Sequence, residues 1–448
     1  MPLKRSRILR VRRMSVLALA LLGLQPARAE DLVELYNAAR DFDATYLSVR
    51  AQAEAAEHAA AQSKALWLPN VSAAVTGVRT ETKPAVLPDQ RIGGNDVTSR
   101  LNARQALFNP GNSVTVSQAN KHLEEARIAL IAAEQDLIVR VAQTYFDVLG
   151  AQDALATARA NKAAITEQLA SAKRNFEVGT ATITDTREAQ ARFDLATAQE
   201  IVAENDLRTR RILLDQLVGR ANVAPKPLAV PAALPAVLPS DPEHWAKTAA
   251  SANPVILRSA LELEVAQLET DKARAGHLPT VDLVATAATD RNWGALAVAQ
   301  SNWGSTKTAT LGVQMNMPLF AGFSVQNRIR ETLALQEKSR QDLEAARRDA
   351  DQRSRTAYFG VQSGLAQVKA LEAAEDSSKL ALEATRLGYK VGVRVNLDVL
   401  NAQNQLFQTQ RDLAKARYDV LVHELQLRQV AGILKPDDLD EVNQLLAK

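Results

Sequence analysis

The sequence contains one pattern twice, and this duplication limits what the chain can fold into. FEVGTATITDTREAQARFDLATAQ at 176–199 matches YKVGVRVNLDVLNAQNQLFQTQRD at 389–412, an offset of 213 residues. The same offset relates the Tyr-Phe pair at 145–146 to the pair at 358–359. At matching positions earlier in the two copies the offset differs from 213 by a few residues, which indicates loops of different length between the matched elements. Because a fixed period is typical of repeated structural units, we expect two copies of one unit.

A proline-rich segment joins the two copies. Residues 221–242, ANVAPKPLAVPAALPAVLPSDP, contain six prolines, which lack the backbone N–H and fix φ. We therefore expect an extended linker there rather than a helix. The predicted organisation is a first structural repeat at 30–220, the linker at 221–242, a second structural repeat at 243–432 and a short C-terminal helix at 433–448.

The first 29 residues have the features of a secretory signal peptide. A basic stretch is followed by an apolar run at 15–24 and by the A-x-A cleavage pattern at 27–29. About ten apolar residues are too few to span a bilayer as a helix. Met14 is an alternative start. We predict that residues 1–29 are a signal peptide that is absent from the mature chain.

Removal of this segment reverses the sign of the net charge. The segment carries seven of the 54 basic residues and none of the 51 acidic ones, so the mature chain has a net charge of −4. The basic pI near 9 belongs to the precursor. The basic pI therefore gives no support for a nucleic-acid partner of the mature chain.

Short strand patterns interrupt helical ones at equivalent places in both halves. A helical stretch at 31–67 stops at Leu68-Pro69, because proline cannot continue a helix. Strand-like stretches follow at 70–80 and up to Phe108, and again at 280–290 and 308–320. In the last of these, apolar residues alternate with polar ones, which is typical of a strand with one apolar face. Four short strands leave edges that further copies of the chain would close.

The helical stretches are longer than a compact domain uses. Residues 112–178 contain no proline and one glycine, so a continuous helix would be roughly 100 Å long at about 1.5 Å per residue. Apolar residues recur every seven positions, which is typical of a coiled-coil seam. This pattern fits a cylinder of helices and equally a coiled-coil rod.

These features together resemble the TolC family of outer-membrane efflux and secretion ducts over residues 30–448. The segments AGHLPTVDLVAT at 275–286 and LGYKVGVRVNLDVLNAQNQLFQTQRDLAKARYDV at 387–420 carry the resemblance most closely. The resemblance implies a mainly α fold with a membrane β-barrel: a homotrimer in which each chain gives four strands to a twelve-stranded barrel. It also implies that long coiled-coil helices form a periplasmic tunnel, with the linker near its equator.

The resemblance further implies partners and a location. The duct lies in the cell outer membrane, in contact with lipid, and its helical part spans the periplasm. A periplasmic adaptor joins it to an inner-membrane pump of the ABC, RND or MFS type. The cargo stays open, since drugs, a protein toxin and other solutes are all compatible with a polar tunnel.

The sequence contains none of the common motifs of catalytic sites that we considered. The sequence lacks cysteine, a phosphate-binding G-x-x-x-x-G-K-[ST] loop and the H-E-x-x-H and G-x-S-x-G motifs. The five histidines are scattered without the spacing of metal ligands. We therefore expect no enzyme, no cofactor and no metal site.

The resemblance places a gate at the two Val-Gly turns. In similar ducts these turns line the periplasmic mouth, and polar links hold it closed. The matching gate residues here are Thr184, Asp185, Tyr389 and Arg394. We expect Arg394 to pair with Asp185, with Tyr389 nearby. The alternative for Asp185, in the pattern Asp185-x-x-Glu188, is N-capping of a helix.

Two further positions at the mouth are implied to form an entrance constriction. Similar ducts carry two aspartates one helical turn apart, and here Asp398 matches the first while Asn401 stands at the second. We expect a weaker affinity for cations than two acidic rings would give. The tips themselves, where an adaptor would dock, are Val178, Gly179, Val391 and Gly392.

Two other functions compete with the duct. A secreted coiled coil such as an adhesin stalk would explain the helices, but it would not need strand pairs at the same place in both halves. A periplasmic adaptor also has helical hairpins, but the sequence shows no lipoyl-like β-domain.

Overall fold

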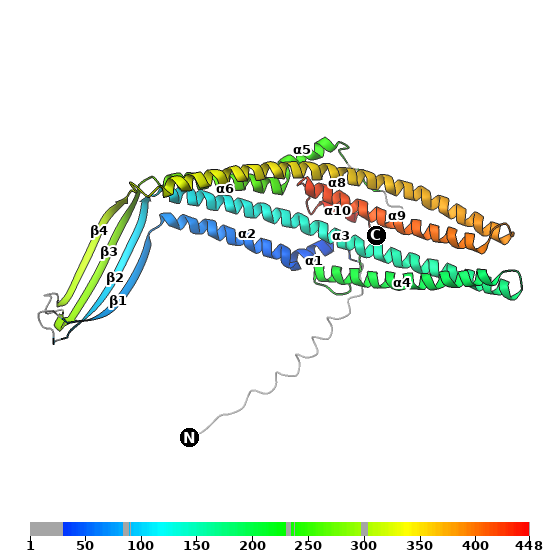
Figure 1. Ribbon diagram of the computed structural model, residues 1–448, viewed down its shortest axis with the longest axis horizontal. Coiled ribbons are helices and arrows are strands. Elements are labelled where there is room, and N and C mark those ends of the chain that lie inside the picture. The colour runs from blue at the N-terminus through cyan, green and yellow to red at the C-terminus, as the bar shows by residue number, and fades with distance from the viewer. Residues whose placement is uncertain are drawn as a thin grey trace, which may run out of the picture. The chain divides into compact units, whose positions relative to one another are not determined.

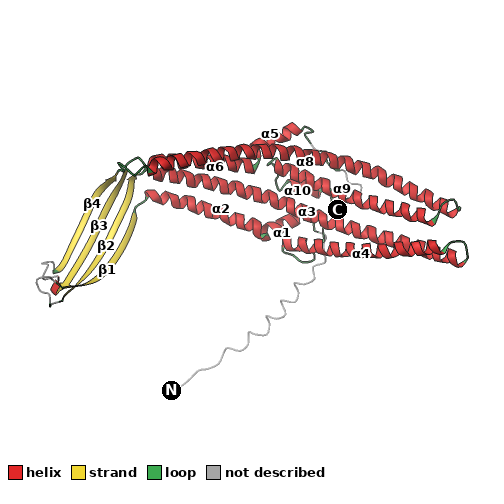
Figure 2. Cartoon of the chain, viewed as in Figure 1, coloured by secondary structure: helices red, strands yellow, loops and turns green. Residues whose placement is uncertain are grey.

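The computed structural model describes residues 30–83, 89, 91–229, 234–236, 238–296 and 303–447. The predicted signal peptide lies outside these residues. Figures 1 and 2 show long helices and a β-sheet. The elements are α1 (Leu32–Phe42), α2 (Ala44–Ser63), the 3₁₀ helix η1 (Lys64–Trp67), β1 (Asn70–Thr82), β2 (Ile92–Phe108), α3 (Pro110–Glu177), α4 (Ile183–Val218), α5 (Pro242–Ala252), α6 (Pro254–Ala275), β3 (Thr280–Gly294), β4 (Gly304–Asn316), α8 (Ser324–Lys390), α9 (Asn396–Val430) and α10 (Asp438–Asn443).

The prediction of a mainly helical chain with four strands is confirmed. Helix α3 runs without interruption for 68 residues and α8 for 67. Each half of the sequence supplies two strands, one very long helix and shorter ones. The predicted single helix at 31–67 is broken. Asp43 ends α1, and its Oδ1 accepts the backbone N–H of Tyr46 at 2.7 Å in α2.

The chain forms two compact units. One contains the described residues of Met1–Leu47, Ala133–Asn253 and Asp351–Lys448, and the other Ser48–Ala132 and Pro254–Ala350. Each unit therefore contains segments from both halves of the sequence. Helices α3 and α8 contribute residues to both units.

The four strands form one antiparallel sheet in the order β1-β2-β3-β4. Paired residues in this register share a face, so the period-two alternation of each strand gives the sheet two chemically different faces. The apolar face carries Val71, Ala73 and Val75 of β1, Leu101 and Ala103 of β2, Leu283, Ala285 and Ala287 of β3, and Leu311, Val313 and Met315 of β4. Leu311 is 76% exposed and Val75 is 75% exposed. This face is an exposed apolar surface.

The opposite face of the sheet is polar and internally hydrogen-bonded. The Thr98 hydroxyl donates to Asp290 at 2.7 Å, and Arg104 forms an ion pair with Asp282 at 2.6 Å. No helix among the described residues combines the length and apolarity needed to cross a membrane.

The core of the first unit is built around the duplicated aromatic pairs. Tyr145 and Phe146 are fully buried, and their rings meet edge to face at 5.4 Å. Tyr358 and Phe359 repeat this geometry at 5.5 Å, but Phe359 is exposed. Phe146 also stacks on Tyr418 of α9 at 5.6 Å. The same sequence pair therefore packs differently in the two halves.

Within the first unit, the described residues of the proline-rich linker before α5 are extended rather than helical. Leu228 forms an antiparallel bridge with Leu446, next to α10. Arg428 of α9 holds α10 in place through ion pairs with Asp438 and Glu441 at 2.5 and 2.7 Å, and it also pairs with Glu424 of its own helix at 3.0 Å. The far end of the chain is therefore fixed to the rest of this unit.

Candidate functional site at the two helical hairpins

The two hairpin turns have the same backbone geometry. Gly179 and Gly392 both adopt φ +80°, a left-handed conformation that favours glycine at the end of a helix. The hydrogen bonds around them recur at the 213-residue offset: Val178 N to Arg174 O and Val391 N to Leu387 O at 3.1 Å, Thr180 N to Asn175 O at 2.8 Å and Val393 N to Gly388 O at 2.9 Å. The sequence duplication is thus reproduced bond by bond at these turns.

The helices that follow the turns begin at equivalent aspartates. Thr182 is the N-cap of α4: its hydroxyl accepts the N–H of Asp185 at 3.2 Å, and Asp185 accepts the N–H of Thr182 at 2.9 Å. This capping box corrects the expected pattern, in which Asp185 itself was the cap. In α9 the Asp398 carboxylate accepts the N–H of Val395 at 3.4 Å. Asp185 and Asp398 both stabilise a helix start.

The gate residues are brought together only in part. The Tyr389 hydroxyl accepts a hydrogen bond from the Asn175 amide at 3.2 Å, which joins the ends of α8 and α3. Arg394 meets Asp398 at 3.6 Å, in an exposed i,i+4 pair. The expected pair of Arg394 with Asp185 is not formed within this chain. Thr184 is exposed in the first turn of α4.

Arg192, which was not predicted as a site residue, contacts one of the residues predicted for the entrance. Its Nη2 donates to the Oδ1 of Asn401 at 2.9 Å, joining α4 to α9. Asn401 is the position where the resemblance led us to expect an aspartate. The sequence shows an arginine seven residues after Asp185. Its contact with Asn401, however, follows only from the packing of α4 on α9.

Buried amides line the contact between α3 and α9. Gln168 donates to Asn396, and Gln403 donates to the backbone carbonyl of Asn161 at 3.4 Å. Gln403 is only 1% exposed and Asn396 only 3%. Among the described side chains, the Asn161 Oδ1 and the Asn396 Nδ2 are buried without a hydrogen-bond partner.

These amides follow the heptad spacing of both helices. Asn161 and Gln168 are seven residues apart on α3, as are Asn396 and Gln403 on α9, so the antiparallel helices meet in two amide layers. Buried unpaired amide groups each cost about 1–3 kcal/mol. The contact is therefore weaker than an apolar seam of the same length.

The tips of the turns present apolar side chains to solvent. Val178 is 72% exposed and Val391 is 65% exposed, and Val393 next to it is exposed as well. Both turns thus carry an unpartnered valine immediately before the glycine. Such exposed apolar tips are suited to contact with another protein.

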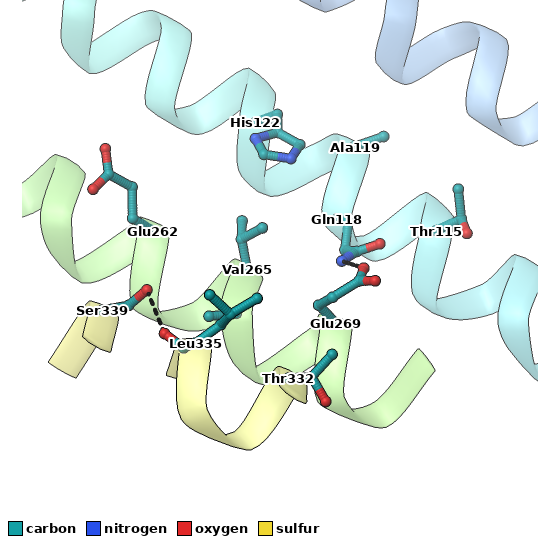
Figure 3. A pocket seen from close by; sticks show the side chains of 11 residues that line it. Thr115, Gln118, Ala119, His122, Glu262, Val265, Glu269, Thr332, Leu335 and Ser339 are labelled. Carbon is teal, nitrogen blue, oxygen red and sulfur yellow. Dashed lines mark hydrogen bonds between the residues drawn. The ribbon is translucent and has the colours of Figure 1, made fainter. Parts of the chain in front are cut away.

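A groove in the other unit has no catalytic chemistry. Its volume is about 510 Å³, and Figure 3 shows that α3, α6 and α8 line it. The Glu269 carboxylate accepts from Gln118 at 2.8 Å and pairs with Arg328 at 2.7 Å, so both of its oxygens are engaged. Nowhere in the described part of the chain do three or more histidines or carboxylates gather in a geometry that could hold a metal ion.

Comparison with known proteins identifies the family. The outer membrane efflux protein family matches residues 35–220 and 245–433. The chain belongs to this family. It is 33% identical over 418 residues to the outer membrane protein TolC of Vibrio cholerae, covering 93% of each chain. It is 31% identical to the alkaline protease secretion protein AprF of Pseudomonas aeruginosa, covering 95% of this chain and 89% of that one.

Solved structures of membrane proteins share the fold. The VceC outer membrane protein of Vibrio cholerae superposes with a TM-score of 0.75 at 18% identity, covering 90% of this chain and 96% of that one. A membrane protein from Pseudomonas aeruginosa gives a TM-score of 0.78 at 21% identity, covering 90% and 93%. The family and the fold are those of channel proteins. The predicted location is confirmed: the chain is an outer-membrane protein with a periplasmic helical part.

Proposed function

We propose that three copies of this chain form the outer-membrane exit duct of a tripartite efflux pump or a type I protein secretion system. The sheet is the observation that carries the proposal, because its apolar face is exposed on all four strands. In water such a face would be covered by protein, whereas in a membrane it contacts lipid hydrocarbon. A coiled-coil stalk has no use for this surface.

The edges of the sheet support the trimer. Strands β1 and β4, each of 13 residues, lie at opposite edges, and neither has a second strand partner among the described residues. Membrane strands need every backbone group paired, so the edges must close on other copies. Four strands from each of three chains would give a closed barrel of twelve, and the helices would surround the periplasmic tunnel.

The precursor organisation completes the proposal. Residues 1–29 would direct export and be removed, and 30–220 and 243–432 would be the two structural repeats. The linker at 221–242 and the C-terminal segment at 433–448 would lie near the equator of the duct. The chain would catalyse nothing and need no cofactor, in keeping with its family.

Adaptor docking is assigned to the tips of the hairpins. The exposed Val178 and Val391, with Gly179 and Gly392 beside them, are where a periplasmic adaptor would bind and connect an inner-membrane pump of the ABC, RND or MFS type. Similarity to a protease secretion protein and to TolC supports both secretion and efflux systems. A cysteine at Val178 should crosslink to such an adaptor in cells.

The gate would close the mouth through links between neighbouring copies. Arg394 is 61% exposed at its side chain and uses one nitrogen toward Asp398, so its other donors are available to an Asp185 of the next copy. Tyr389 and Thr184 flank this link. Each exposed pair contributes only about 0.2–1 kcal/mol, so an adaptor could open the three links together.

The entrance constriction would be formed by Asp398 and Asn401. Three Asp398 carboxylates around the axis would bind multivalent cations, and the Asn401 amides would add no charge. Asp398→Asn should therefore weaken block of the channel by such cations. Undiminished block would exclude a role for this ring.

Fractionation and conductance measurements test the proposed function. We expect a heat-sensitive trimer in the outer membrane that produces single-channel current steps in a planar lipid bilayer. Arg394→Ala and Asp185→Asn should raise the conductance of the closed duct, while Arg211→Ala, an exposed position far along α4, should not. A soluble monomer, or a protein without channel activity, would contradict the proposal.

A further inference from the structure

Arg192 is oriented toward α9 by the packing of α4. Ala189 and Ala196, on either side of it at spacings of three and four residues, are buried against Leu400 of α9 and against α3. Residues at these spacings share one face of a helix. Arg192 therefore lies on the α9-facing side of α4, where its guanidinium meets Asn401 at 2.9 Å.

The charge of Arg192 is not neutralised by a carboxylate. Its hydrogen bond goes to a neutral amide, and no ion pair joins it to any acidic group in the described part of the chain. Glu188, one turn earlier on α4, does not pair with it. In contrast, Arg159 of α3 is paired with Glu200, and Arg210, further along α4, is paired with Asp147. Arg192 thus brings a full positive charge to Asn401.

The local charge balance at the hairpins points the same way. The segments 173–192 and 383–401 together carry seven basic and five acidic residues, although the mature chain is predicted to be acidic overall. Asp398, the one carboxylate at the constriction, already faces Arg394 at 3.6 Å. Asn401 lies three residues beyond Asp398, about 5 Å further along the helix. The guanidinium of Arg192 is thus within about one Debye length of this carboxylate.

We infer that Arg192 determines the ionic preference of the mouth. Three such arginines, each held on Asn401, would offset the three Asp398 carboxylates, so the mouth would bind multivalent cations weakly and favour the passage of anionic groups over cationic ones. This inference rests on the proposed duct function. It assigns to Arg192 a role in specificity, through the electrostatic potential of the constriction.

Arg192→Gln tests the inference in a planar bilayer. The reversal potential in a potassium chloride gradient should shift toward cation selectivity, because three positive charges are removed near the constriction. Block by lanthanum ions should become tighter on the order of tenfold, the effect of three charges at roughly 8 Å in water with screening. Arg192→Lys keeps the charge and should remain close to the parent protein in both measurements. Arg211→Gln, about 28 Å away along α4, is the matched charge-removal control.

Asn401→Asp provides an independent arm. Asn401→Asp lowers the charge at the mouth by one per copy, as Arg192→Gln does, so lanthanum block should tighten to a similar extent. Arg192→Gln combined with Asn401→Asp should tighten block by about the product of the two single effects, because the charges at the constriction add. The heat-sensitive trimer confirms that each variant has assembled.

Two outcomes separate this inference from the proposed function. A parent protein without channel activity would overturn the duct and the inference together. A parent channel whose selectivity and lanthanum block are unchanged by Arg192→Gln would overturn the inference and leave the duct intact.

Discussion

Gln403 on α9 donates to the backbone carbonyl of Asn161 on α3, at a position where a coiled coil ordinarily places an apolar side chain. One heptad away, Gln168 donates to Asn396 in the same contact. One oxygen or nitrogen in each layer is left buried without a partner among the described residues. The hairpins therefore meet through a contact that is specific in register but weak.

This contact predicts a stabilising substitution. Replacing Asn161 and Gln403 together by leucine removes a buried unpaired oxygen and a long hydrogen bond, so the free energy of unfolding should rise by about 1–2 kcal/mol. Thermal unfolding in detergent measures the change. A matched single variant, Gln403→Leu, should gain less because it leaves the Asn161 amide unpaired. A loss of stability in the double variant would show that the amides are needed for packing.

The duplicated tyrosines offer a comparison within one chain. Tyr145 is fully buried and its hydroxyl donates to the carbonyl of Lys226 at 2.8 Å. Tyr358, at the equivalent position, is also buried, but its hydroxyl has no partner in the part of the chain that the structure describes. Tyr145→Phe should therefore cost about 1 kcal/mol of stability, and Tyr358→Phe close to nothing. Equal effects in denaturant unfolding would contradict this assignment of the hydrogen bond.

The turn glycines should resist substitution for a conformational reason alone. Gly179 and Gly392 have φ +80°, and a Cβ at either position would meet no atom within 4 Å. Alanine at each site should destabilise its hairpin by about 1–2 kcal/mol, because L-residues avoid the left-handed region. Gly360 in α8 also has open space but an ordinary helical backbone, so Gly360→Ala should be neutral or stabilising. Hydrogen exchange of the neighbouring amides would report the local effect.

The pair of Asp43 and Arg140 predicts a pH dependence of stability. Arg140 donates to both carboxylate oxygens at 3.0 Å, and these hydrogen bonds hold the pKa of Asp43 below its ordinary value of 3.8. The stabilisation is therefore present above about pH 4 and is lost as the pH falls through the lowered pKa. Asp43→Asn should cost about 2 kcal/mol at pH 7, and the difference from the parent protein should shrink toward pH 3.

Glu424 gives a control of the opposite sign. Burial raises the pKa of this carboxyl group, and the nearby carboxylates of Glu441 and Asp438 raise it as well, against the opposing effect of Arg428. The folded state therefore favours the protonated form, and stability arising from this group grows as the pH falls through the raised pKa. Glu424→Gln should stabilise at pH 7 relative to the parent protein and lose this advantage in acid. If both variants showed the same pH trend, the assigned shifts would be wrong.

Much of the architecture followed from the sequence because it depends on local chemistry. Leu68-Pro69 ends the first helical region, the proline-free stretch after Pro110 is a single helix, and the alternation gives β4 its two faces. The strand predicted at 308–320 begins and ends four residues earlier, at Gly304–Asn316. The break at Asp43 was not predicted. Asp43 there is also bound by Arg140, which lies 97 residues away in the chain and is brought to it by the fold.

The candidate site at the hairpins was predicted less completely, for the same reason. The turn glycines and the helix starts at Asp185 and Asp398 are local features, so the pattern located them. The cap of α4 is Thr182 rather than Asp185, a shift of three residues that a pattern alone does not resolve. The contact of Arg192 with Asn401 joins residues 209 positions apart and depends on how α4 packs on α9.

A single introduced thiol tests the central claim, that the hairpins form the mouth of an outer-membrane duct. The chain contains no cysteine, so Asn401→Cys provides a unique reporter. The purified trimer should give single-channel currents in a planar bilayer, and a bulky thiol reagent should reduce them in a way that a reductant reverses. Cysteine at Arg211, far along α4, should be labelled without effect on the current. Channels that conduct equally before and after labelling at position 401 would place the mouth elsewhere, and a protein that never conducts would contradict the duct itself.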